Sequence, residues 1–288
     1  MTMDDHRLIF VGGLHRSGTT PFSRILGTHP DISALTNTGG PEDEGQHVQT
    51  VYPSARTYRG SGHFARAAEA HLTESSPLVD PANASKLLRE WEPYWDLGCR
   101  YLLEKSPPNM VMTRFLQALF PEAYFIIVVR HPATVALSTK KWTRFVSRDP
   151  QKFATLSKLV EHWLIAHRIL TEDLPFLRRV HVVYYEDLVT QPAAQLDAVR
   201  SFLGLDAKIP DSGLSARHGT GYEDWWRSLN SRLRPGGWQR RLIERKFADE
   251  IAGFGYDLGD LSTHSSEVSQ LPQGGTRGTP DKHPRNGV

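Results

Sequence analysis

A glycine-rich turn between an apolar run and a helix-forming segment constrains this chain more than any other feature. The run from Leu8 to Val11 is typical of a buried parallel strand. A turn rich in glycine, serine and threonine follows, and Pro21 then suits the first turn of a helix. In such a unit successive backbone N–H groups converge, and the helix N-terminus adds positive potential. The sequence therefore predicts an anion-binding loop on an α/β sheet.

The spacing of this turn matches a nucleotide-binding P-loop at every position but one. Gly13, Gly18, Thr19 and Thr20 fall on the G-x-x-x-x-G-K-[ST] pattern, and Thr19 stands in the place of the lysine. Nucleoside triphosphatases use that lysine on the β- and γ-phosphates, so we expect this loop to bind another anion. Arg16 supplies a cation earlier in the loop. Taken alone, the pattern is also compatible with a glycine turn that merely ends a strand.

The run Gly-x-x-Arg-Ser-Gly-Thr-Thr, which ends at Thr20, resembles the 5′-phosphosulfate loop of sulfotransferases that use 3′-phosphoadenosine 5′-phosphosulfate (PAPS). The form with Arg-Ser is most similar to the tyrosylprotein and bacterial branches. The resemblance implies a three-layer α/β fold with a mainly parallel sheet, PAPS as the donor and adenosine 3′,5′-bisphosphate (PAP) as the product. It implies that the loop residues hold the phosphosulfate, namely Arg16, Ser17, Gly18, Thr19 and Thr20.

A second motif predicts another phosphate site. The β-forming run from Tyr124 to Val129 indicates a central strand, and Arg130 follows at its carboxyl edge. A helix after Pro132 places Ser138 about two turns in. A guanidinium binds phosphate in a bidentate manner, and a hydroxyl adds a neutral donor. This Arg-x-Pro…Ser arrangement resembles the family's 3′-phosphate site, and Tyr185, after a further predicted strand, matches a tyrosine near the adenosine.

Three more basic residues are candidates. Lys105 ends a predicted strand at the edge where open α/β sheets bind ligands, although such a lysine can equally point into water. The phrase Glu-Lys-Ser-Pro resembles the family's position for a lysine that contacts the leaving phosphate and sulfuryl oxygens, which implies a catalytic role. Arg232 and Arg234 lie in a glycine-bearing stretch that loosely resembles the family's closing loop. They are candidates for donor binding, since the longer cytosolic signature is not present.

The segment 36–46 lacks periodicity and carries three carboxylates. A solvated acidic loop is the simpler interpretation. In proteins of the resembling family, however, the segment after the second strand carries the general base, which is Glu in the tyrosylprotein-like branch and His in the cytosolic branch. We therefore expect Glu44 to be the base and Arg16 to assist catalysis, while Glu42 and His47 stay open as alternatives.

Length and composition are typical of one globular domain. The chain has 288 residues, 39% of them hydrophobic, and a net charge of +2. We expect one domain over residues 1–260 and a disordered tail over 261–288, where apolar periodicity stops. The small net charge gives no reason to expect a nucleic-acid partner. No apolar run approaches membrane-spanning length. These features do not decide the oligomeric state, and a homodimer is one of the states that they allow.

Cysteine and histidine usage predicts the compartment and the metal content. The single cysteine, Cys99, excludes an internal disulfide and fits a reducing compartment, so we expect a cytoplasmic enzyme. His162 and His167 lack a Cys/His partner set, so we expect them to be structural and the enzyme to need no metal.

These features together predict a PAPS-dependent sulfotransferase. The acceptor is a hydroxyl or amine of a small molecule, carbohydrate or peptide, because loop sequences do not reveal pocket shape. A P-loop nucleoside or small-molecule kinase is the alternative, and it would use Thr20 to bind Mg²⁺. A non-catalytic nucleotide-binding module is the third candidate.

Overall fold

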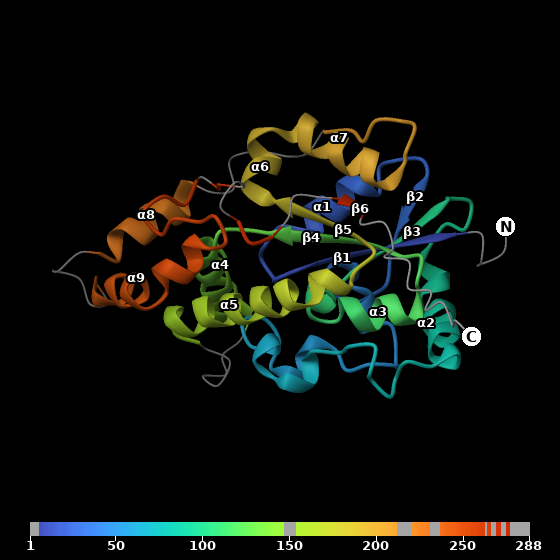
Figure 1. Ribbon diagram of the computed structural model, residues 1–288, viewed down its shortest axis with the longest axis horizontal. Helices are drawn as coiled ribbons and strands as arrows, with labels where there is room; N and C mark the ends of the chain where they lie inside the picture. The colour runs from blue at the N-terminus through green and yellow to red at the C-terminus, as the bar shows by residue number, and fades with distance from the viewer. Residues whose placement is uncertain are drawn as a thin grey trace, which may run out of the picture.

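A sheet of six strands lies at the centre of the computed structural model (Figure 1), which describes residues 6–146, 154–211, 220–230, 237–262, 264–265, 269–271 and 275–276. The strand order is β2-β3-β1-β4-β5-β6. The first five strands run parallel and the last is antiparallel to its neighbour. Their bounds are β1 (Arg7–Gly13), β2 (Ile32–Ala34), β3 (Tyr101–Lys105), β4 (Tyr124–Val129), β5 (Arg179–Tyr184) and β6 (Gly275–Thr276).

Both faces of the sheet are buried, which explains why its strands read as continuous apolar runs. Ile9 and Val11 of β1 pack into one core, while Leu8 and Phe10 pack into the other. The register places Val11 beside Lys105, so the lysine lies next to the strand that leads into the glycine loop. The predicted mainly parallel sheet is confirmed.

Helices cover the two faces and complete a three-layer arrangement (Figure 1). One core contains side chains of α1, α6 and α7, and the other contains side chains of α2, α3 and α5. At one end of the sheet α4 contacts α5 and α8, and α5 contacts α9. The bounds are α1 (Thr19–Leu26), α2 (Pro81–Trp91), α3 (Thr113–Leu119), α4 (Pro132–Val146), α5 (Leu156–Asp173), α6 (Tyr185–Thr190), α7 (Pro192–Leu203), α8 (Thr220–Ser228) and α9 (Gly237–Ala252).

The described residues beyond position 260 pack on the sheet. The Tyr184 hydroxyl donates to the Leu271 carbonyl at 3.1 Å, and the Leu271 side chain is buried. The short strand β6 pairs with β5. These described segments therefore pack against the sheet, and they fall within the range 261–288 that the sequence predicts to be a tail. The other tail residues lie outside the described part of the chain.

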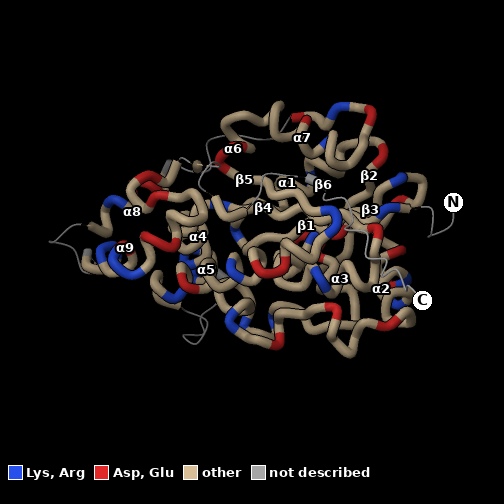
Figure 2. Tube along the Cα trace, viewed as in Figure 1, with Lys and Arg blue, Asp and Glu red and all other residues tan. Residues whose placement is uncertain are grey.

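Lys and Arg positions are interspersed with Asp and Glu positions along the described chain (Figure 2), and the net charge of the full sequence is +2. Within the described ranges, no helix combines the length and apolar character needed to cross a membrane. The same ranges contain no group of three or more His, Cys, Asp or Glu residues that could hold a metal ion. Cys99 is a free, partly exposed thiol.

Candidate active site

The loop between β1 and α1 depends on glycine at two positions. Gly13 has φ +151°, and a Cβ there would lie 2.5 Å from the Val128 carbonyl oxygen. Gly18 has φ +99°, and a Cβ there would collide with the ring of Tyr185. Glycine is the residue that adopts such conformations without strain. The predicted loop and the predicted adenosine-side tyrosine are therefore in direct contact.

Polar groups of this loop are left available for an anion. Helix α1 begins at Thr19, and no side chain in the described residues caps its N-terminus. The Ser17 hydroxyl is buried without a hydrogen-bond partner among the described residues. Unpaired N–H groups at a helix start and a buried hydroxyl fit a phosphate or sulfate oxygen. The residues present thus fit the phosphosulfate group that the sequence predicted.

The predicted 3′-phosphate residues meet the loop on its other side. Arg130 Nη1 donates to the Arg16 carbonyl at 3.3 Å, and its guanidinium carbon lies 4.1 Å from the ring centroid of Tyr185. Arg16 Nε donates to the Ser138 hydroxyl at 3.2 Å. The Tyr222 hydroxyl of α8 also donates to Ser138, at 3.1 Å. Four residues that the sequence predicted to bind PAPS therefore form one cluster, to which Tyr222 adds a hydroxyl. The four are Arg16, Arg130, Ser138 and Tyr185.

Buried contacts hold the backbone around Arg130. Trp163 Nε1 donates to the Arg130 carbonyl at 2.9 Å. The next N–H, that of His131, donates to Glu186 Oε1 at 3.0 Å, and the Tyr256 hydroxyl donates to the other carboxylate oxygen at 2.9 Å. Burial lowers the pKa of His131 to about 4, so its ring is neutral at pH 7. The guanidinium of Arg130 thus extends from a fixed strand end.

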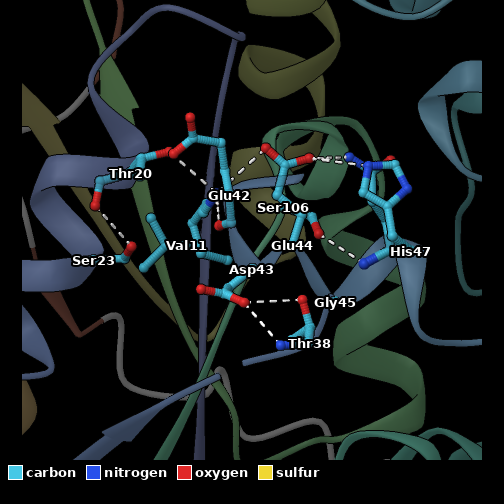
Figure 3. A network of polar contacts seen from close by, with 12 residues as sticks. Val11, Thr20, Ser23, Thr38, Glu42, Asp43, Glu44, Gly45, His47 and Ser106 are labelled. Atoms are coloured by element: carbon cyan, nitrogen blue, oxygen red, sulfur yellow. Dashed lines mark hydrogen bonds and ion pairs between the residues drawn. The ribbon is translucent and has the colours of Figure 1, made fainter. Parts of the chain in front are cut away.

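On the acceptor side, Lys105 joins the loop to the acidic segment, whose residues Glu42, Asp43 and Glu44 are labelled in Figure 3. Its Nζ donates to Thr20 Oγ1 at 3.2 Å, to the Glu42 carbonyl at 2.8 Å and to Glu44 Oε1 at 3.3 Å. Lys105 is 3% exposed and Glu44 is 6% exposed. Sequence reasoning left open whether Lys105 points into water, and the structure places it in this buried network.

The three carboxylates of the acidic segment have different surroundings. Glu42 directs its carboxylate to the exposed Arg24, 3.4 Å away. Asp43 Oδ1 accepts from both the N–H and the hydroxyl of Thr38, which closes the loop. Glu44 alone among the three contacts Lys105 through its side chain. This geometry favours Glu44 over Glu42 as the group that handles a proton.

His47, the other candidate base, lies behind Glu44. Its Nε2 is 3.6 Å from Glu44 Oε2, and burial lowers its pKa, with the nearby Arg56 and Lys105 acting in the same direction against Glu44. Gln46 Nε2 donates to the same Glu44 oxygen at 2.6 Å. His47 therefore contacts Glu44, the proposed base, and both residues line the same cavity.

That cavity has a volume of about 580 Å³ and lies between the glycine loop and the acidic segment. Its wall includes Thr20, Glu44, His47, Arg56 and Trp142. His15 of the loop lines it too, and burial lowers the pKa of this imidazole. A cavity that shares residues with both the anion loop and Glu44 can hold an acceptor beside the donor.

Sequence reasoning missed several residues of the site. His15 lies beside Arg16 and Gln46 lies close to Glu44, but both occupy positions that the motifs leave unspecified. Tyr222 carries no motif signal, because its contact with Ser138 joins segments 84 residues apart. Glu104 had a usable signal, since it is a charged residue inside an apolar strand directly before Lys105. Arg232 and Arg234, named as donor-loop candidates, lie outside the described residues.

Comparison with known proteins identifies the family. Residues 8–209 match the model of the sulfotransferase family. Protein-tyrosine sulfotransferase 2 of Gallus gallus is 27% identical over 201 residues, which cover 69% of this chain and 51% of that protein. Nodulation protein NoeE of Sinorhizobium fredii is 29% identical over 217 residues, which cover 69% of this chain and 50% of that protein. The chain thus spans about half the length of these curated relatives.

A solved structure supports the fold. Sulfotransferase STF9 from Mycobacterium avium superimposes with a TM-score of 0.51 at 14% identity, covering 88% of this chain and 78% of that one. At this identity the likeness concerns the fold. The family match, in contrast, extends from β1 to beyond α7 and includes the glycine loop, Lys105 and Arg130. The chain therefore belongs to the sulfotransferase family.

Proposed function

We propose that the protein transfers the sulfuryl group of PAPS to a hydroxyl or amine and releases PAP. The observation that carries this proposal is the buried pair of Glu44 and Lys105 beside an anion loop whose helix N-terminus is uncapped by described side chains. Membership of the sulfotransferase family supports it, and gives no support to the P-loop kinase alternative.

The donor would be held from two sides. The N–H groups of the loop, the Ser17 hydroxyl and Arg16 would bind the 5′-phosphosulfate, while Arg130 and Ser138 would bind the 3′-phosphate. The ring of Tyr185 lies between these two groups, in contact with Gly18 and with the Arg130 guanidinium. A guanidinium and several neutral donors suit a phosphate ester, because charge-assisted hydrogen bonds are the stronger ones.

When bound, PAPS supplies a sulfuryl group whose bond to the bridging phosphate oxygen breaks as the acceptor atom binds the sulfur. Glu44 would take the proton that the acceptor hydroxyl or amine loses. Lys105 and the loop N–H groups would stabilise the negative charge that develops on the leaving phosphate oxygen. Lys105 is already fixed toward the loop by its bonds to Thr20 and to the Glu42 carbonyl.

The acceptor would occupy the cavity of about 580 Å³ next to Glu44. Its wall combines Trp142 and Pro41 with the charged side chains of Arg56 and Glu44. Such a wall suits an acceptor with both apolar and polar groups. A small molecule, a sugar unit and a single residue of a peptide all meet that description.

The experiment that tests this function starts with ligand binding. We expect PAP to raise the melting temperature well above the shift that ADP produces, because only PAP carries the 3′-phosphate. A ligand at about 100 times its dissociation constant adds roughly 2.7 kcal/mol to the stability of the native state. Transfer of radiolabelled sulfate from PAPS to a panel of phenols, sugars and peptides then tests turnover.

Equal shifts with PAP and ADP would remove the case for a 3′-phosphate site. A strong PAP shift without transfer to any acceptor of the panel would instead support the non-catalytic nucleotide-binding module.

A further inference from the structure

A carboxylate that the proposed reaction does not use lies inside β3. Glu104 precedes Lys105 and is completely buried. Its Oε1 accepts from the Gly45 N–H at 3.0 Å and from the Ser106 hydroxyl at 2.5 Å, and its Oε2 accepts from Asn109 Nδ2 at 2.5 Å. Three donors thus converge on one buried side chain, so both of its carboxyl oxygens have hydrogen-bond partners.

Two of these donors lead directly to the proposed base (Figure 3). Gly45 follows Glu44 in the chain, so Glu104 fixes the backbone at the base itself. The Ser106 hydroxyl accepts from the Gln46 N–H at 3.0 Å, and the Gln46 side chain donates to Glu44 Oε2 at 2.6 Å. Glu104 of β3 and Ser106, the residue after the strand, therefore hold the segment that carries the base, while Lys105 at the end of β3 contacts the base carboxylate.

The contact between Glu104 and the base segment is too close for any residue but glycine. A Cβ at Gly45 would lie 2.5 Å from Glu104 Oε1. The Gly45 carbonyl also accepts from Trp91 Nε1 at 3.1 Å, so the backbone N–H and the backbone carbonyl of Gly45 are both fixed. The backbone next to Glu44 consequently has little freedom to move.

Burying the Glu104 carboxylate costs desolvation free energy, which its hydrogen bonds have to offset. Burial raises the pKa of Glu104 to about 7, although the bonds from Ser106 and Asn109 and the charge of Lys105 act in the opposite direction. The charge of Glu44 adds to the rise, and Glu104 in turn adds to the effect of burial in raising the pKa of Tyr52. Because apolar packing in its place would avoid this desolvation, the carboxylate calls for a reason other than stability.

We propose that Glu104 is a positioning residue for Glu44, which holds the base carboxylate at the distance from Lys105 and the acceptor cavity that proton transfer requires. This inference rests on the proposed function, because it assumes that Glu44 is the base. Glu104 does not contact donor or acceptor, and it acts through Gly45, Ser106 and Gln46.

The test is Glu104→Gln, which keeps the size and one acceptor oxygen but removes the charge. We expect kcat to fall about tenfold to a hundredfold, since a misplacement of about 1 Å can cost that much. The affinity for PAP should stay within about twofold, because Glu104 has no contact with the donor cluster. Asp173→Asn is the matched control, as Asp173 is a fully buried carboxylate bonded to His71 and Thr113, and it should leave kcat within about twofold.

A double-mutant cycle separates positioning from general destabilisation. If Glu104 acts through Glu44, then Glu104→Gln should change kcat by less than about twofold when Glu44 is already Gln. An equal loss in both backgrounds, or a loss in kcat no larger than that of Asp173→Asn at the same melting temperature, would overturn the proposal.

A second variant covers the case in which Glu104→Gln does not fold. Ser106→Ala removes the link to the Gln46 N–H, and it should lower kcat without changing PAP affinity and lose this effect in the Glu44→Gln background. A different result would show that the proposed function itself is wrong. A wild-type protein that binds PAP but transfers no sulfate would refute the function, and the inference with it, whereas an active wild type with an additive cycle would refute the inference alone.

Discussion

Replacing the proposed base tests the site most directly. Glu44 is buried, with its carboxylate 3.3 Å from Lys105 Nζ and 2.6 Å from Gln46 Nε2. In Glu44→Gln the amide keeps the shape and can still accept from one of these donors, but it cannot take a proton. Loss of a general base lowers the rate by about 10²–10⁴-fold. At about 1.36 kcal/mol per tenfold change, the barrier rises by roughly 2.7–5.5 kcal/mol.

The assay compares turnover with donor binding in the same variants. Radiolabelled transfer from PAPS should show a loss in kcat of at least a hundredfold for Glu44→Gln, while PAP affinity stays nearly unchanged. Glu42→Gln is the matched control, since its carboxylate lies in the same segment but faces Arg24 in solvent. Glu42→Gln and His47→Asn should each lower kcat by less than about tenfold.

Two results would refute this reasoning. One is a Glu44→Gln variant that keeps more than about a tenth of the wild-type kcat. The other is a pH–rate profile whose acidic limb persists in Glu44→Gln but disappears in Glu42→Gln or His47→Asn. Either outcome would move the role of base to another residue.

Three further predictions concern donor binding, turnover and acid stability. Arg130→Ala should weaken PAP binding by about 1.5–3 kcal/mol, which is the value of a charge-assisted hydrogen bond. Lys105→Ala should chiefly lower kcat. An effect of Lys105→Ala that is confined to the KM for PAPS would contradict the catalytic role of this lysine. Burial lowers the pKa values of His131 and His181 to about 4 and that of His167 to about 3. Between pH 6.5 and these values, the three histidines bind protons in the unfolded chain but not in the folded one. Each of them should therefore lower the free energy of unfolding by about 2 kcal/mol at pH 5. Glu104, whose pKa is raised to about 7, acts in the opposite direction as the pH falls from 7, as do Glu186 and His71, whose pKa values are also raised. Burial lowers the pKa values of His15, His47 and His162 as well, so six histidines act against these three groups, and the urea midpoint should be lower at pH 5 than at pH 7.

The parts of the site that the sequence could predict follow from strand ends and glycine chemistry. Apolar runs such as Tyr124–Val129 form strands wherever a sheet is buried on both faces, and parallel strands place their carboxyl ends at one edge. Lys105 and Arg130 were therefore predictable as neighbours of the loop before any contact was known. The positive φ angles of Gly13 and Gly18 were also predictable, because glycine adopts them without strain and a glycine pattern marks such positions.

The choice among the three carboxylates was not predictable, because it depends on backbone angles that no periodicity encodes. Two short 3₁₀ turns flank Glu44, and Glu42 adopts a positive φ of 55°. These angles turn the side chain of Glu42 toward Arg24 and its carbonyl toward Lys105. The carboxylates of Glu42 and Glu44 thus contact different cations, Arg24 and Lys105, although both residues line the cavity, and family resemblance alone could only rank the two residues.

The long-range contributors were missed for a different reason. Tyr222 reaches Ser138 across 84 residues of sequence, and Glu104 reaches Gly45 across 59. Such pairs depend on how whole elements pack, so their residue types carry meaning only once the sheet order is known. Glu104 differs from Tyr222 in one respect, because a carboxylate within an apolar strand must find buried donors or remain neutral. Its three donors belong to the base segment and to the turn after β3, so the unexplained charge in the strand was itself the indication that a polar site lies behind Glu44.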